Sequence, residues 1–271
     1  MGFRPLGDRH AIQEVVFILN FARPIDASEM DRFFESHELW KAELPKSVRP
    51  NVFQVFLGPE GANGAPPPPP PATIAPAIFQ SFRRDGALEW QMQANQNWLA
   101  VNCLFYSRWD AVSKQALNLL DRGLQSLQSE GLSVVSVTLQ YIDTFVWEGS
   151  LLDYDSKGLL NPNSRMLPKE FNPDGPAWHF HSGAFDLSET KNSRRRLMRR
   201  IHIDSQVEGA TSVSRLDISL TSDFLDGVGG LKPIAFDEIT SEMEWLHEEN
   251  KKLLSEIISE DMQHRIALFG E

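Results

Sequence analysis

Two histidines stand at a spacing that a metal site could use. His179 and His181 are two residues apart, so in an extended strand both side chains point to the same face. Imidazole is a common zinc ligand, and His202 or Asp217 from neighbouring predicted strands could supply a third ligand. Apolar residues share the histidines' parity further along the strand, which favours instead a structural pair on a core or interface face. Both interpretations stay open at this stage.

A run of arginines is the second candidate for chemistry. Residues 194–200 read Arg-Arg-Arg-Leu-Met-Arg-Arg, which in a strand places guanidinium groups on both faces and suggests an edge strand. A surface that binds the phosphates of nucleic acid or of a nucleotide would use Arg194, Arg196, Arg199, Arg200 and, from the next strand, Arg215. Alternatively, the arginines pair with the acidic final helix. The absence of an RNA-recognition aromatic pattern and of a helix-turn-helix favours this alternative.

Six consecutive prolines follow a glycine-rich segment at residues 66–71. Proline cannot donate a backbone hydrogen bond, so we expect a surface loop. As a polyproline II rod, this loop would present Pro66, Pro68 and Pro71 to an aromatic-lined groove of a partner protein. No Arg or Lys flanks the prolines as in the usual ligands of this type, so an expanded hairpin loop is the other interpretation.

The sequence contains no familiar catalytic motif. It has no nucleophile elbow, no Walker loop and no paired-histidine zincin motif, and residues 227–230 (GVGG) lack the sequel of a dinucleotide fold. Cys103 is the only cysteine and alternates within a predicted strand, so we interpret it as a packing residue. Aspartates scattered over predicted strands could serve two-metal chemistry, but such scatter is common: Asp143, Asp186, Asp204 and Asp217. We expect no cofactor, and the sequence favours a binding protein over an enzyme.

Composition and charge restrict the class of protein. The 271 residues are 41% hydrophobic and 23% charged, as in ordinary globular proteins. A formal net charge of -11 opposes approach to nucleic acid or to anionic lipid. No apolar stretch approaches the ~20 residues of a membrane span, and the N-terminus lacks the apolar run of a signal peptide. We therefore expect a cytoplasmic protein that does not enter the membrane.

Hydrophobic periodicity predicts an α+β protein. Strand patterns alternate with period two and helix patterns recur every three to four residues. Predicted strands cover residues 14–21, 52–57, 78–105 as a meander, 132–146, 178–188, 194–206 and 212–223, and predicted helices cover 28–44, 107–131 and 236–267. We expect two antiparallel sheets, each covered by helices and arranged as a pseudo-repeat. The expected units are an N-terminal half at 1–148, a linker rich in Gly, Pro and Asn at 149–176, and a C-terminal meander with its long helix at 177–271.

Short motifs carry a resemblance to a known family. Tyr106-Ser107-Arg108-Trp109 opens a predicted helix, Leu139-Gln140-Tyr141-Ile142-Asp143 lies in a predicted strand, and Leu246-His247 lies in the final helix. With a Pro24-Ile25 step after the first strand, these motifs resemble a sporadically distributed family of uncharacterised bacterial proteins of similar length. The family has Asn where this chain has Asp143. The resemblance implies no activity or catalytic residue, but the patchy distribution resembles that of phage-defence or toxin-linked genes.

Together these features predict a protein that binds a partner rather than a catalyst. We expect a protein-binding module or a subunit of a complex, with its partner encoded nearby, in a bacterial defence or toxin-linked operon. Seven tryptophans and a long amphipathic helix also suggest a homodimer. The alternative is a nucleic-acid or nucleotide-binding protein, or a metal-dependent nuclease, that uses the strand at Arg194 to Arg200.

Overall fold

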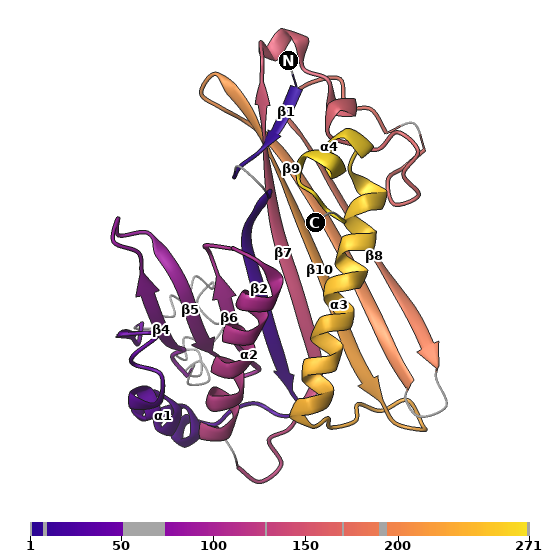
Figure 1. Ribbon diagram of the computed structural model, residues 1–271. Helices are drawn as coiled ribbons and strands as arrows, with labels where there is room; N and C mark the ends of the chain where they lie inside the picture. Colours follow the sequence, from indigo (N-terminus) through magenta and orange to yellow (C-terminus); the bar gives the residue numbers. More distant parts are fainter. Residues whose placement is uncertain are drawn as a thin grey trace, which may run out of the picture.

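Ten antiparallel strands form one sheet that runs through the molecule (Figure 1). The computed structural model describes residues 2–7, 10–50, 74–127, 129–169, 171–189 and 194–269. The strand order is β3-β4-β5-β6-β2-β7-β10-β9-β8, and β1 also pairs with β7. The strands are β1 (Gly2–Pro5), β2 (Ile12–Phe21), β3 (Lys46–Val48), β4 (Ala77–Phe82), β5 (Leu88–Ala94), β6 (Trp98–Cys103), β7 (Val134–Glu148), β8 (Trp178–Glu189), β9 (Arg194–Glu208) and β10 (Thr211–Leu225). The strand predicted at 52–57 and the prolines Pro66, Pro68 and Pro71 lie outside the described residues.

The prediction of two sheets, each with its own helices and repeated along the chain, is wrong. The two predicted meanders are the two wings of a single sheet, because β2 pairs with β7 in its middle. In this pairing Val15 lies opposite Tyr141 and Leu19 lies opposite Val137. On its other side β7 pairs with β10, which brings in the second wing. The alternation of side chains along a strand does not specify its partner strand, so the sequence pattern could not reveal this joint.

The helices lie on one face of this sheet (Figure 1). They are α1 (Ala27–Glu35), α2 (Trp109–Ser126), α3 (Phe236–Ile257) and α4 (Glu260–Arg265). Helix α2 packs against β6, and α3 packs against β7 and β10. The approach of α2 is close: a Cβ added to Gly123 would lie 3.0 Å from Leu99 Cδ2. Among the described helices, none has both the length and the apolar character needed to cross a membrane.

The opposite face of the sheet carries polar side chains that bond across the strands. Thr138 bonds to Thr221 at 2.8 Å between hydroxyl oxygens, and Gln140 donates to Asp217 Oδ1 at 2.8 Å. We call this surface the open face, because α1 to α4 all lie on the other side. The face is set by residue parity, since the buried Leu139 on the helix side alternates with these polar neighbours along β7.

The final helix is interrupted, whereas the sequence pattern predicted one helix to residue 267. Ile258 has extended dihedral angles (φ -93°, ψ 153°), and Ser259 caps α4 by accepting from the backbone N–H of Met262. The helix is interrupted here because backbone groups of the segment 149–176, the expected linker, form hydrogen bonds with backbone groups at the end of α3. Asn161 donates its N–H to the carbonyl of Ile257 at 2.8 Å. The segment 149–176 therefore packs against the end of α3.

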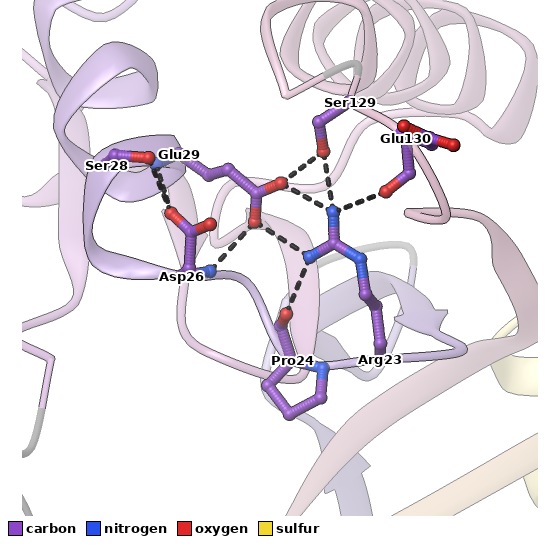
Figure 2. Close-up of polar contacts among 7 residues, drawn as sticks. All are labelled: Arg23, Pro24, Asp26, Ser28, Glu29, Ser129 and Glu130. Atoms are coloured by element: carbon purple, nitrogen blue, oxygen red, sulfur yellow. Dashed lines mark hydrogen bonds and ion pairs between the residues drawn. The ribbon is translucent and has the colours of Figure 1, made fainter.

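Arg23 ties the beginning of α1 to the loop between α2 and β7 (Figure 2). Its guanidinium donates to both carboxylate oxygens of Glu29, at 2.9 and 2.6 Å. The same group donates to Ser129 Oγ at 2.8 Å and to the carbonyl of Glu130 at 2.9 Å. Glu29 also accepts from the backbone N–H of Asp26, as in a capping box. The hydrogen bond from Arg23 is the main reason that the pKa of buried Glu29 falls to about 2.

Candidate functional site

Side chains from three distant sequence motifs meet between the sheet and the helices. They are Tyr106 just before α2, Trp109 as the first residue of α2, Tyr141 and Asp143 on the helix side of β7, and His247 on α3. We call these five residues the motif cluster. The hydroxyl of Tyr141 lies 2.8 Å from His247 Nδ1, and the indole of Trp109 stacks on the imidazole of His247 with ring centroids 4.0 Å apart. Three of the four motifs on which the resemblance rests thus meet in one structural unit, whereas the Pro24-Ile25 step lies outside it (Figure 2).

Trp109 holds the imidazole of His247 in place. Its indole lies between the ring of Phe17 on β2, at 5.6 Å and an angle of 16°, and the imidazole, at 4.0 Å and an angle of 6°. The indole N–H donates to Glu244 Oε2 at 2.6 Å. Stacking on both ring faces and a hydrogen bond at the edge fix the indole, so the imidazole has one rigid wall.

Burial keeps both partners of the Tyr141–His247 hydrogen bond uncharged at neutral pH. Burial raises the pKa of Tyr141 well above its usual value, so the phenol keeps its proton beside Nδ1 of His247. Burial and the nearby ammonium group of Lys251 lower the pKa of His247 to about 4. His247 is therefore uncharged at neutral pH.

Asp143 is the unusual member of the motif cluster. Its side chain is 1% exposed, and neither carboxyl oxygen has a hydrogen-bond partner among the described residues. Burial raises its pKa to about 7. Burial and the Asp143 carboxyl also raise the pKa of Tyr106, so these two groups lie near each other. The partner strand β2 has an irregular register opposite this position, between Ile12 and Glu14. Asp143 is therefore a buried carboxyl that changes charge near neutral pH.

A groove between α2 and α3 begins at the motif cluster. Its volume is about 620 Å³, which lies within the range of ligand-binding clefts. Three kinds of side chain line the groove: apolar (Trp109, Leu117 and Phe236), uncharged polar (Ser113, Asn118, Thr240 and Ser241) and charged (Lys114, Asp121 and Glu244). Trp109 lines the groove and also stacks on His247, so it connects the groove with the buried part of the motif cluster.

The histidine pair of the sequence analysis lies elsewhere, on the open face of β8. His179 and His181 are exposed and share one face, and the register places His202 opposite His181 and Asp217 opposite His202. The carboxylate of Asp217 is already bonded to Gln140. In the part of the chain that the structure describes, no three His, Cys, Asp or Glu side chains form a group that could hold a metal ion.

The arginine run forms β9, which lies inside the sheet between β10 and β8, so the predicted edge strand is wrong. Arg194 begins the strand opposite Leu225. The expected pairing with the final helix holds for Arg195, which binds Glu242 on α3 at 2.6 Å. Its guanidinium also lies 4.0 Å over the ring of Trp245.

Four of the other arginines pair with carboxylates of the sheet rather than with the helix. Arg196 binds Asp223 at 2.7 Å, Arg215 binds Glu208 at 2.9 Å, and the guanidinium of Arg200 lies 3.8 Å from the carboxylate of Asp217. Arg199 pairs with Asp186 on β8. The expectation that these four pair with the final helix is wrong, because the register aligns acidic residues of β8 and β10 with the arginines of β9 and brings Glu208 of β9 near Arg215 of β10.

No family model, curated protein or solved structure matches this chain. The support for the candidate site therefore comes from its geometry alone. The residues of the motif cluster stand in short sequence motifs, from which no site was predicted. Aromatic residues at a helix start and a Tyr-x-Asp alternation in a strand were the available signal. Their convergence depends on the pairing of β2 with β7, which the pattern does not contain.

Proposed function

We propose that this protein is a non-catalytic binding module that takes a segment of a partner protein into the groove between α2 and α3. The main support is the connection of that groove with the motif cluster through Trp109. A rigid aromatic wall beside polar and charged side chains is typical of surfaces that bind a peptide segment. The resemblance of the three motifs to a patchily distributed bacterial family supports a partner encoded by a neighbouring gene, in a defence or toxin-linked operon.

The charges of the groove indicate the chemistry of the partner. Asp121 and Glu244 line it together with a single cation, Lys114. The whole chain carries a formal charge of -11, so the approach of a basic segment is favoured. Trp109, Leu117 and Phe236 supply apolar contacts. We therefore propose a basic, amphipathic segment as the occupant, with apolar side chains on one side and Lys or Arg on the other.

The nucleic-acid alternative has weaker support. A phosphate surface on β9 would have to compete with carboxylates that already neutralise Arg196, Arg199 and Arg200. Each exchange would leave a carboxylate next to the incoming phosphate, which costs free energy through repulsion. The ion pairs thus make these arginines poor phosphate ligands.

Selection of peptides from a phage-displayed library on the folded protein tests the proposal. We expect enrichment of peptides that combine Lys or Arg with aliphatic or aromatic residues. Binding of a synthetic peptide from this selection should weaken at least tenfold in the double variant Asn118→Arg/Ser241→Arg, because both exposed side chains line the groove and the new charges repel a basic segment.

A matched control adds the same charge outside the groove. Leu152→Arg/Val228→Arg places two arginines at exposed positions after β7 and after β10, neither of which lines the groove. We expect peptide binding to this variant to remain close to that of the wild-type protein. Equal weakening in both double variants would contradict the groove as the binding site, because it would show only an effect of net charge. Selected peptides without basic residues would contradict the proposed partner chemistry.

A further inference from the structure

Strand β8 ends the sheet, and its outer edge pairs with no other strand of the described chain. Its twelve residues give an edge about 40 Å long. The register between β8 and β9 runs without a shift from Trp178 opposite Ser205 to Glu189 opposite Arg194. This edge is therefore long and regular, and its outward backbone groups are spaced to continue a ladder.

The usual protections of an edge strand are missing from β8. Residues 178–187 read WHFHSGAFDL and contain no proline, lysine or arginine. The single charge, Asp186, is paired with Arg199 of the neighbouring strand. The opposite edge of the sheet differs: β3 has only three residues, and one of them is Lys46. Natural sheets shorten, bend or charge an edge that must stay free in solution.

Two large apolar side chains stand exposed on this unprotected strand. Phe185 is 63% exposed and Leu187 is 64% exposed, and both lie on the open face together with His179 and His181. Arg196 lies 5.3 Å from the ring of Phe185, on the side of β9. The outer side of these residues is open to another molecule.

We propose that β8 pairs antiparallel with β8 of a second copy of this chain, so that two sheets join into one. A two-fold axis perpendicular to the sheet produces this pairing and keeps the odd-numbered side chains of both strands on one face. Phe185 and Leu187 of each copy then pack against open-face side chains of the other copy. A second copy fits because the only Asp, Glu, Lys or Arg within residues 178–187 is Asp186, which Arg199 neutralises. This stretch of the two edges can therefore approach without the repulsion that the net charge of -11 otherwise produces.

This surface is independent of the groove between α2 and α3. The groove lies between helices that cover β6, β7 and β10, whereas β8 is two strands beyond β10 in the sheet. The dimer and the proposed partner site can therefore be tested separately, and failure of one leaves the other unaffected.

Sedimentation equilibrium of the wild-type protein and of charged β8 variants tests the proposal. We expect the mass of a dimer for the wild type at high micromolar concentration. Phe185→Lys/Leu187→Lys and Phe185→Glu/Leu187→Glu should each sediment as monomers, since like charges would meet across the two-fold axis. An equimolar mixture of the two variants should recover the dimer mass. Because both side chains are exposed, thermal unfolding should be nearly unchanged in the two variants.

Leu152→Lys provides the control, since Leu152 is 97% exposed and lies outside β8. This variant should remain a dimer. A wild-type protein that stays monomeric at high micromolar concentration overturns the proposal. Dimers that persist in both charged variants also overturn it, because the contact between the copies would then lie outside β8. Failure of the mixed variants to form a dimer overturns it as well, because opposite charges on two facing β8 strands should attract.

Discussion

The carboxyl of Asp143 and the imidazole of His247 lie in the same buried cluster, and burial shifts their pKa values in opposite directions. The pKa of Asp143 rises to about 7, and that of His247 falls to about 4. A raised carboxyl pKa makes the folded state less stable as pH rises from about 4 to 7, because the unfolded chain loses its proton first. A lowered imidazole pKa makes the folded state more stable as pH rises from about 4 to 6.5, because the unfolded chain holds the extra proton. The two contributions oppose each other over most of this range.

Replacing either residue should reveal the pH dependence of the other. For Asp143→Asn we expect the free energy of unfolding to rise with pH between about 4 and 6.5, since His247 then acts alone. For His247→Asn, whose amide oxygen can still accept from Tyr141, we expect it to fall between about 4 and 7. One pKa unit corresponds to ~1.4 kcal/mol, so each change is on the order of a few kcal/mol. Urea unfolding at a series of pH values measures both slopes.

The charged groups near His247 contribute equally to the pH dependence of both variants. Glu248 and Lys251 on α3 and Asp110 at the beginning of α2 act on His247, and all three remain in both variants. Their contributions to the pH dependence are therefore shared. Slopes of the same sign in the two variants would contradict the assignment of opposite pKa shifts to Asp143 and His247.

At the level of elements, the beginning of α1 depends on Glu29. Glu29→Gln removes the charge that accepts from Arg23, Ser129 and the backbone of Asp26 (Figure 2). We expect a loss of about 2 kcal/mol in the free energy of unfolding at neutral pH, since hydrogen bonds to charged groups contribute about that much. The pKa of Glu29 is lowered to about 2, so its contribution is present above about 4.5 and disappears as pH falls toward 2. Denaturant unfolding at neutral and acidic pH measures this difference.

Asp31→Asn in the same helix is the matched control. Asp31 pairs with Arg49 at the surface, where its side chain is 55% exposed. Exposed pairs contribute little, so we expect almost no change in stability at either pH. A loss in Asp31→Asn as large as that in Glu29→Gln would mean that net charge, rather than the buried network, stabilises α1.

The individual elements were largely predictable from the sequence, but their partners were not. Alternation located the strands that became β8, β9 and β10, and helical periodicity located α2 and α3, because these signals are local. The pairing of β2 with β7 and the break at Ile258 depend on contacts between residues more than 90 positions apart. Local periodicity carries no record of such contacts, so it predicted two sheets and an unbroken final helix.

At the scale of the whole molecule, the candidate residues divide between the two faces of the sheet. The histidine pair and Arg196, Arg200 and Arg215 lie on the open face, with their charges largely balanced by acidic neighbours in the sheet. The motif cluster and the groove lie on the helix face. The arginines and histidines were candidates because of their residue types. The register between strands, however, determines which side chains lie next to one another. This explains why most residues singled out from the sequence lie on the open face, whereas the groove lies on the helix face.

The arginines of β9 allow a test of whether they only form ion pairs within the sheet or also bind phosphates. If they only balance carboxylates of the sheet, Arg196→Ala/Arg200→Ala should lower the melting temperature modestly, since exposed pairs contribute ~0.2 to 1 kcal/mol each. Wild-type protein should then show no binding to single-stranded or duplex DNA, or to RNA, at physiological salt. Fluorescence anisotropy across a range of salt concentrations measures this. Contact with phosphates would instead give affinity that falls steeply with salt, and the double variant would flatten that slope by about two released counterions. We expect the first outcome, because Asp223 already binds the guanidinium of Arg196, and the carboxylate of Asp217 lies 3.8 Å from Arg200, where it would repel a phosphate.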